Sequence, residues 1–223
     1  MYARQQLAAA VLAAGLSLTG TSVYAQSAAP HQGEASASQP RKCHWWQFGR
    51  CNQNEPAVEG LPDGAPQTGT VITVDLSTNT AYLFEDGRML AKSRAATGSG
   101  KTLVHGDDEW AFHTPQGHMK VLRKIVDPVW RKPDWAYLEA GQRVPPLDSP
   151  KRLVKGHLGK YALDLGDGIM IHGTDDPSSI GQKVSHGCIR LPNAMLARVY
   201  KAAHVGTDVF VYQSEEPQMA AVR

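Results

Sequence analysis

Short runs in which apolar and polar residues alternate fill the chain from about residue 68 to residue 213. Such a period of two predicts β-strands, because successive side chains of a strand point to opposite faces. Asp86-Gly87, directly after one of the runs, is a strong hairpin turn signal. The predicted strands are TVITVDL (70–76), AYLFE (81–85), RMLAKSRAAT (88–97), HMKVLRKIV (118–126), KYALDL (160–165), GIMIHG (168–173) and DVFVY (208–212).

One helix is predicted late in the chain. Leu191-Pro192-Asn193 opens it, because proline is favoured in the first helical turn, and Gly206 is expected to stop it. An apolar stripe at helical spacing runs through Met195, Leu196, Val199 and Tyr200. Many short strands with one late α-helix predict a mainly-β domain of the sandwich or barrel-like type.

Residues 127–157 fit neither period. They hold five prolines together with Trp130, Trp135 and Tyr137. Long irregular insertions in compact domains are usually functional or disordered, and the aromatic residues favour order. We therefore interpret this insertion as a lid or substrate wall.

The first 25 residues predict an export signal. Arg4 supplies a positive start, an apolar run extends from Leu7 to about Leu18, and Val23-Tyr24-Ala25 offers small residues for cleavage. The alternative, a membrane anchor, is disfavoured because the run is short and its end is interrupted by Gly and Ser. No cysteine follows at the cleavage site, which disfavours a lipid anchor. We predict a chain with no membrane span after cleavage, located in the periplasm, with an extracellular or wall-associated location as the alternative.

Residues 26–66 form a predicted linker, rich in Ala, Ser, Gln and Pro. Within it the segment CHWWQFGRC (43–51) carries three aromatic residues, which favours a small stapled loop docked on the domain over an exposed knob. The catalytic domain is predicted at residues 67–213, and residues 214–223 are predicted to be a disordered tail.

Charge and cysteine content narrow the function. The formal net charge is +2, and loss of the signal would lower it to +1, so the basic face that nucleic acid requires is not expected. Three cysteines enter an oxidising compartment, where two can pair and one stays free. We predict that Cys43 and Cys51 form a disulfide and that Cys188 is the free thiol.

The candidate chemistry lies in IHGTDDPSSIGQKVSHGCIRL (171–191). A thiol needs a nearby imidazole before it becomes a strong nucleophile. His172 ends a predicted strand, and a loop containing Gly and Pro returns the chain to Cys188, so two strand ends can bring the groups together. Gly187 permits the tight backbone of an oxyanion site. The predicted helix after Cys188 is expected to lower the pKa of the thiol further.

These residues resemble the catalytic domain of L,D-transpeptidases (YkuD type), whose signature is a His, a spacer, and then Ser/Thr-His-Gly-Cys. Here it reads His172, a spacer, and Ser185-His186-Gly187-Cys188-Ile189-Arg190-Leu191. HTPQGHMKV (113–121) and HLGKYALDL (157–165) resemble two further segments of the family. The resemblance implies a β-rich fold that needs no cofactor or metal. It also implies an enzyme that attacks the third residue of a peptidoglycan stem tetrapeptide, expels the terminal D-Ala and passes the thioester to an amine.

The resemblance also implies roles for single residues. Cys188 is the expected nucleophile and His172 the expected base, with the backbone carbonyl of Gly173 orienting the imidazole. Backbone amides around His186, Gly187 and Cys188 are expected to stabilise the oxyanion, in the logic of a catalytic triad with a carbonyl in place of the carboxylate.

Two further residues keep two interpretations each. His186 either helps to polarise the thiol or supports the loop. Arg190 either holds a substrate carboxylate in a bidentate contact or forms a structural ion pair. Ser185 is expected to supply a hydroxyl to the loop or turn, close to the substrate. The other histidines of the domain have no spacing that indicates catalysis.

Two other classes of function compete with the enzyme. His172, His186 and Cys188 could be three ligands of a zinc ion, although no fourth ligand is evident. A wall-binding module without turnover would be marked by loss of Cys188 or His172, and both are present. Within the enzyme class the acceptor stays open: a second stem peptide giving 3→3 cross-links, a lysine of an envelope lipoprotein, another amine, or water in an L,D-carboxypeptidase or amide hydrolase.

Overall fold

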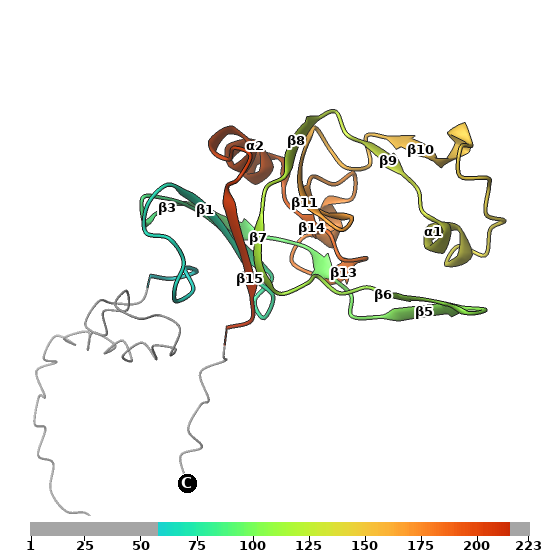
Figure 1. Cartoon of the computed structure of the whole chain (residues 1–223), viewed down its shortest axis with the longest axis horizontal. Helices are drawn as coiled ribbons and strands as arrows, with labels where there is room; N and C mark the ends of the chain where they lie inside the picture. Colours follow the sequence, from blue (N-terminus) through green and yellow to red (C-terminus); the bar gives the residue numbers. More distant parts are fainter. Residues whose placement is uncertain (1–57, 215–223) are drawn as a thin grey trace, which may run out of the picture. The chain divides into compact units, whose positions relative to one another are not determined.

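The computed structural model describes residues 58–214, and that part of the chain is built mainly from short strands, as the alternation predicts (Figure 1). The predicted signal peptide and the predicted Cys43–Cys51 loop lie outside the described residues, so both stay predictions. No helix within residues 58–214 is long and apolar enough to cross a membrane.

Five strands form the first sheet, in the order β3-β2-β1-β15-β7. The first and last strands of the domain, β1 and β15, run parallel at its centre, and the other neighbours are antiparallel. The strands are β1 (Thr70–Asp75), β2 (Thr80–Glu85), β3 (Arg88–Arg94), β7 (Gly117–Lys120) and β15 (Asp208–Tyr212).

Four strands form the second sheet, in the order β14-β12-β11-β8. β12 and β14 run parallel, so their carboxyl ends lie at the same edge of the sheet. This edge carries the candidate site. The strands are β8 (Arg123–Val126), β11 (Tyr161–Gly166), β12 (Ile169–His172) and β14 (Ile189–Arg190).

The main core joins the two sheets to the long helix α2 (Asn193–Ala202). Met195, Leu196 and Val199 of the predicted apolar stripe are buried in it, and Tyr200 packs at its margin. Burying aliphatic side chains of this size contributes roughly 1.5–3 kcal/mol each. The other large members of the core are Ile72, Val74, Leu83, Val121, Leu163, Ile171, Ile189, Leu191, Val209 and Val211.

The chain from residue 58 onward already lies against the outer face of the first sheet, where the sequence predicted a spacer. Leu61 and Ala65 are buried in a second apolar cluster with Tyr82 and Phe84. The physical reason is the outer face of β2: its two aromatic side chains need an apolar cover, and the Pro- and Gly-rich segment supplies it.

The opposite end of the domain also extends beyond the predicted boundary. The Ser214 hydroxyl donates to the Asp75 carboxylate over 2.7 Å. Burial of Asp75 raises the pKa of its carboxyl, but hydrogen bonds from Ser77 and Ser214 outweigh burial and lower that pKa to about 2. Ser214, placed in the disordered tail by the sequence, is therefore tied to the end of β1.

Two predicted strands are divided in the structure. The run 88–97 becomes β3 and the short strand β4 (Thr97–Gly98), and the run 118–126 becomes β7 and β8. The second break has a clear cause. Val121 exchanges backbone hydrogen bonds with the Gly206–Thr207 turn, which directs the chain from the first sheet into the second.

Outside the insertion, a hairpin and two short strands were not predicted from the sequence. β5 (Thr102–His105) and β6 (Asp108–Ala111) pair as an extended hairpin (Figure 1), with Gly106 in the turn at φ +62°. β13 (Lys183–Ser185) pairs with β4 just before the candidate nucleophile, and β14 is the other missed strand.

The insertion at 127–157 is ordered, as its aromatic residues predicted, but it is not irregular. β9 (Val129–Arg131) pairs with β10 (Leu153–Lys155), and a short second helix, α1 (Asp134–Leu138), lies between them with a 3-10 turn at Pro150–Arg152. The expectation of one helix thus holds for long helices only.

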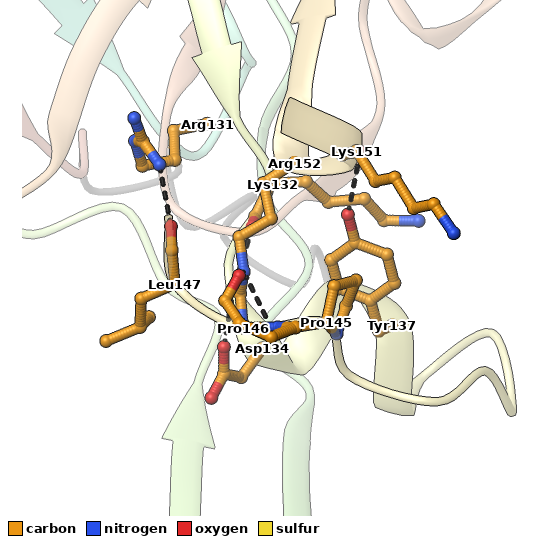
Figure 2. A network of polar contacts seen from close by, with 9 residues as sticks. All are labelled: Arg131, Lys132, Asp134, Tyr137, Pro145, Pro146, Leu147, Lys151 and Arg152. Carbon is orange, nitrogen blue, oxygen red and sulfur yellow. Dashed lines mark hydrogen bonds and ion pairs between the residues drawn. The ribbon is translucent and has the colours of Figure 1, made fainter. Parts of the chain in front are cut away.

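A buried arginine fixes the path of the insertion (Figure 2). The Arg152 side chain is 3% exposed and pairs with the Asp134 carboxylate at 2.7 Å. Its guanidinium donates to the backbone carbonyls of Lys132, Pro145 and Pro146. A buried cation needs such a set of acceptors, because a charge taken out of water is costly unless it is paired and hydrogen-bonded.

Candidate active site

His172 and Cys188 lie on the same face of the second sheet. Across the parallel strands, Ile171 is opposite Ile189 and His172 is opposite Arg190. Both isoleucines are buried in the main core. Because side chains alternate along a strand, His172, Arg190 and Cys188, which directly precedes β14, project from the opposite face.

The His172 imidazole is held in one tautomer. Its Nδ1 lies 2.5 Å from the Gly173 carbonyl oxygen, which can only accept, so Nδ1 carries the proton and Nε2 keeps its lone pair. The ring is buried, and burial lowers the pKa of His172 from 6.5 to about 4, with the Gly173 hydrogen bond opposing that change and Arg190 adding to it. The imidazole is therefore neutral at pH 7.

The Gly173 carbonyl is positioned by close backbone packing. Gly173 N–H donates to the Leu158 carbonyl over 2.9 Å. A Cβ on Gly159 would lie 2.9 Å from the Gly173 Cα, closer than side chains tolerate. The Leu158-Gly159 pair, identified from the sequence only by resemblance, thus acts as the support of the residue that orients the imidazole.

The Cys188 thiol is half-buried and donates to the Gly168 carbonyl over 3.4 Å. Burial raises the pKa of Cys188, and a hydrogen bond from the Met170 amide and the positive charge of Arg190 oppose that rise without cancelling it. The sequence predicted a lowered pKa for this thiol. Desolvation of the thiolate outweighs the favourable charges, so the resting pair is a neutral thiol and a neutral imidazole.

The loop before Cys188 is locked by hydrogen bonds. Ser185 is buried, and its hydroxyl donates to the Cys188 carbonyl over 2.6 Å and accepts from the Gly187 amide over 3.2 Å. The Thr114 hydroxyl donates to the Gly187 carbonyl over 2.8 Å. Gly187 has φ +124°, a conformation that favours glycine. The Ser185 hydroxyl therefore engages both the Cys188 carbonyl and the Gly187 amide within the loop.

The His186 side chain faces the insertion. Its Nε2 lies 2.7 Å from the Glu139 carboxylate, and its ring stacks on Trp135 at a centroid distance of 4.1 Å. Phe112 meets the ring edge-on at 4.5 Å. Of the two interpretations of His186, this arrangement favours support of the loop.

Arg190 lies half-buried beside the pair. Within residues 58–214 its guanidinium makes no ion pair or side-chain hydrogen bond; its backbone amide donates to the Ala96 carbonyl. A structural ion pair, one of its two interpretations, is therefore not found in the described part of the chain.

The zinc alternative receives no support from the geometry. Among the residues that the structure describes, no three His, Cys, Asp or Glu side chains are arranged to hold a metal ion.

Several residues around the site were not identified from sequence. Thr114 had no assigned role within the quoted segment 113–121, and Phe112 and Glu139 carry no local motif. They reach the site only through tertiary contacts, so the spacing of residues along the sequence could not have identified them.

Fold and site together define a β-rich domain with a thiol and a neutral imidazole on neighbouring parallel strands. The family model of the L,D-transpeptidase catalytic domain (YkuD) matches residues 69–211, and the chain belongs to that family.

Curated relatives agree with this assignment. The chain is 37% identical over 180 residues to the probable L,D-transpeptidase YbiS of Escherichia coli K12, a match that covers 74% of this chain and 56% of that protein. It is 30% identical over 169 residues to the probable L,D-transpeptidase ErfK/SrfK of Salmonella typhimurium, covering 69% of this chain and 52% of that protein. The chain therefore spans little more than half the length of these relatives.

Solved structures resemble the chain more distantly. An L,D-transpeptidase from Xylanimonas cellulosilytica is 21% identical, with a TM-score of 0.49 over 71% of this chain and 64% of that one. One from Mycobacterium smegmatis is 26% identical, with a TM-score of 0.47 over 64% of this chain and 58% of that one.

Proposed function

We propose that this chain is an exported L,D-transpeptidase that acts on peptidoglycan stem tetrapeptides through a thioester on Cys188. The observation that carries the proposal is the His172 imidazole. Its Nδ1–H donates a hydrogen bond to the Gly173 carbonyl, which leaves the Nε2 lone pair free, and its ring projects from the same sheet face as the thiol. A neutral imidazole with a free Nε2 lone pair is the group that a general base requires.

Acylation begins with proton transfer from the Cys188 thiol to His172 Nε2 as sulfur attacks the carbonyl carbon of the third stem residue. Because both groups are neutral at rest, transfer and attack occur together rather than from a preformed thiolate. The tetrahedral oxyanion accepts hydrogen bonds from backbone amides around His186, Gly187 and Cys188. In the resting structure the Gly187 amide already donates to Ser185, which favours the other two. The C–N bond then breaks, and D-Ala leaves with the proton from imidazolium.

Deacylation repeats these steps with an acceptor amine. His172 takes a proton from the amine as its nitrogen attacks the thioester, and the proton returns to sulfur as the C–S bond breaks. A second stem peptide yields a 3→3 cross-link, and a lipoprotein lysine yields anchoring of that protein. The alternative acceptor, water, would make the enzyme an L,D-carboxypeptidase.

Arg190 is the proposed contact for a substrate carboxylate. Its guanidinium is unpaired within residues 58–214 and lies near enough to Cys188 and His172 to affect the pKa of both. A planar guanidinium with free donors suits a bidentate carboxylate contact. This contact would orient the stem peptide before attack.

The periplasm is the proposed location, and the predicted N-terminal export signal supports it. The proposed partners are the stem peptides of the wall. A lipoprotein acceptor is a second proposal that depends on which amine is accepted.

The test is digestion of tetrapeptide-bearing cell wall with the exported form, followed by mass spectrometry of the released muropeptides. We expect loss of D-Ala and new 3→3 linked dimers, with Cys188→Ala as the inactive control. Tripeptides without dimers would assign the carboxypeptidase alternative. Unchanged tetrapeptides in the presence of a folded wild-type protein would contradict both.

A further inference from the structure

The insertion (residues 127–157) contacts the loop before the nucleophile (residues 185–187) through one residue, His186. Three groups surround that imidazole: the Glu139 carboxylate at 2.7 Å from Nε2, the Trp135 ring stacked at 4.1 Å with an interplanar angle of 21°, and the Phe112 ring edge-on at 4.5 Å. Trp135 belongs to α1 and Glu139 follows it directly, so α1 and the residue after it supply two of the three contacts. His186 is two residues from Cys188, within the locked loop.

A second set of contacts joins the insertion to the loop that follows His172. Trp130 of β9 stacks on His157 at a centroid distance of 4.6 Å. The Nδ1 of His157 lies 2.9 Å from the carboxylate of Asp175, three residues after His172. The two sets of contacts are connected, because the rings of Trp130 and Trp135 lie next to each other with their centroids 6.2 Å apart.

Internal contacts hold the parts of the insertion together. Arg152 binds α1 through Asp134 and binds the returning chain through the Pro145 and Pro146 carbonyls (Figure 2). The Tyr137 hydroxyl donates to the Lys151 carbonyl over 3.0 Å. These contacts tie α1, the returning chain and the 3-10 turn to one another, so the insertion links His186 to the loop that follows His172.

We propose that Glu139 and Trp135 are positioning residues for the nucleophile: by fixing the His186 ring they fix the backbone from His186 to Cys188, and with it the oxyanion amides. Of residues 185–187, His186 is the one whose side chain contacts the insertion, since Ser185 turns back onto the Cys188 carbonyl and Gly187 has no side chain. Misplacing reacting groups by about 1 Å can cost on the order of a hundredfold in rate. The insertion thereby takes part in catalysis without touching the reacting atoms.

Two readouts on the full exported chain test this. Hydrogen exchange of the amides at 186–189, followed by mass spectrometry, measures positioning whatever the substrate is. Turnover of a stem tetrapeptide measures its consequence and rests on the proposed function. Glu139→Ala is expected to speed exchange at 186–189 at least tenfold, and to lower kcat about tenfold with KM changed less than threefold.

Conservative variants distinguish the loss of a specific contact from a general loss of folding. Glu139→Gln retains an oxygen that accepts from His186, and Trp135→Phe retains a ring for the stack, so both should stay within threefold of wild type in both readouts. Asp148→Ala removes an exposed carboxylate of the same insertion and is the matched control, expected to match wild type. Combining Glu139→Ala with His186→Ala should cost no more than His186→Ala alone, because both break one contact.

The outcomes separate the two proposals. Exchange at 186–189 unchanged in Glu139→Ala would overturn the positioning role, whether or not the wild type turns over substrate. If the wild type is active, faster exchange at 186–189 in Glu139→Ala with an unchanged kcat would also overturn the positioning role. Faster exchange in a chain whose wild type shows no turnover would uphold the positioning role and reject the proposed function.

Discussion

His172 and Arg190 are register partners across the parallel strands β12 and β14, and this pairing brings Cys188 to the same sheet face as the imidazole. Neither residue is near the other in sequence. Their pairing turns a motif with a spacer into a site with a base, a nucleophile and a cation on one surface.

A carbapenem should acylate the Cys188 thiol. Family resemblance implies that a β-lactam carbonyl traps the nucleophile as a stable acyl-enzyme. Intact-protein mass spectrometry after meropenem should show one adduct, on the peptide that contains Cys188, and Cys188→Ala should show none. An adduct that persists in Cys188→Ala would reject the catalytic assignment.

His172→Ala should acylate roughly a hundredfold more slowly, since general bases contribute about 10²–10⁴ to rate. His186→Ala should cost less, because its Nε2 is bound to Glu139 and it acts through the loop. A greater loss in His186→Ala than in His172→Ala would transfer the role of base to His186.

Acid should destabilise the domain through His172. Its pKa is about 4 folded against 6.5 unfolded, so the unfolded chain takes up a proton first as pH falls. The stability present above pH 6.5 is lost between pH 6.5 and 4, by about 3 kcal/mol. Urea unfolding at pH 7 and pH 4 should show this loss in the wild type and not in His172→Gln. His105→Gln, at an exposed histidine, should behave as wild type. An equal loss in His172→Gln would show that other groups cause it.

Removing the Arg152 guanidinium should loosen the insertion more than the core. Arg152→Met would leave the Pro145 and Lys132 carbonyls and the Asp134 carboxylate without their donor, at a cost of about 3 kcal/mol. Hydrogen exchange should rise across 129–155 and stay slow in β1, β11 and β12. Lys151→Met, at the exposed neighbour, should change neither. Exchange that rises equally in the core strands would show that the insertion and the sheets unfold as one unit.

Three features could be predicted from the amino-acid sequence: the strongly alternating strands of both sheets, the helix that follows Pro192, and the motif that contains His172 and Cys188. These depend on local information: side-chain periodicity, turn residues, and a spacing that is specific in itself. The boundaries at residues 58–66 and at Ser214 did not follow from composition, because burial there depends on the aromatic face of β2 and on Asp75, both distant in the chain.

The protonation of the Cys188 thiol and the side-chain partners of His186 depend on the tertiary structure. The sequence showed charges that favour a thiolate, but the desolvation that opposes them depends on how deeply the fold buries Cys188. Likewise the side chain of His186 could turn toward the thiol or away from it until α1 placed Glu139 and Trp135 beside its ring. Burial and long-range contacts are properties of the packed chain, and for that reason neither is written in the spacing of a motif.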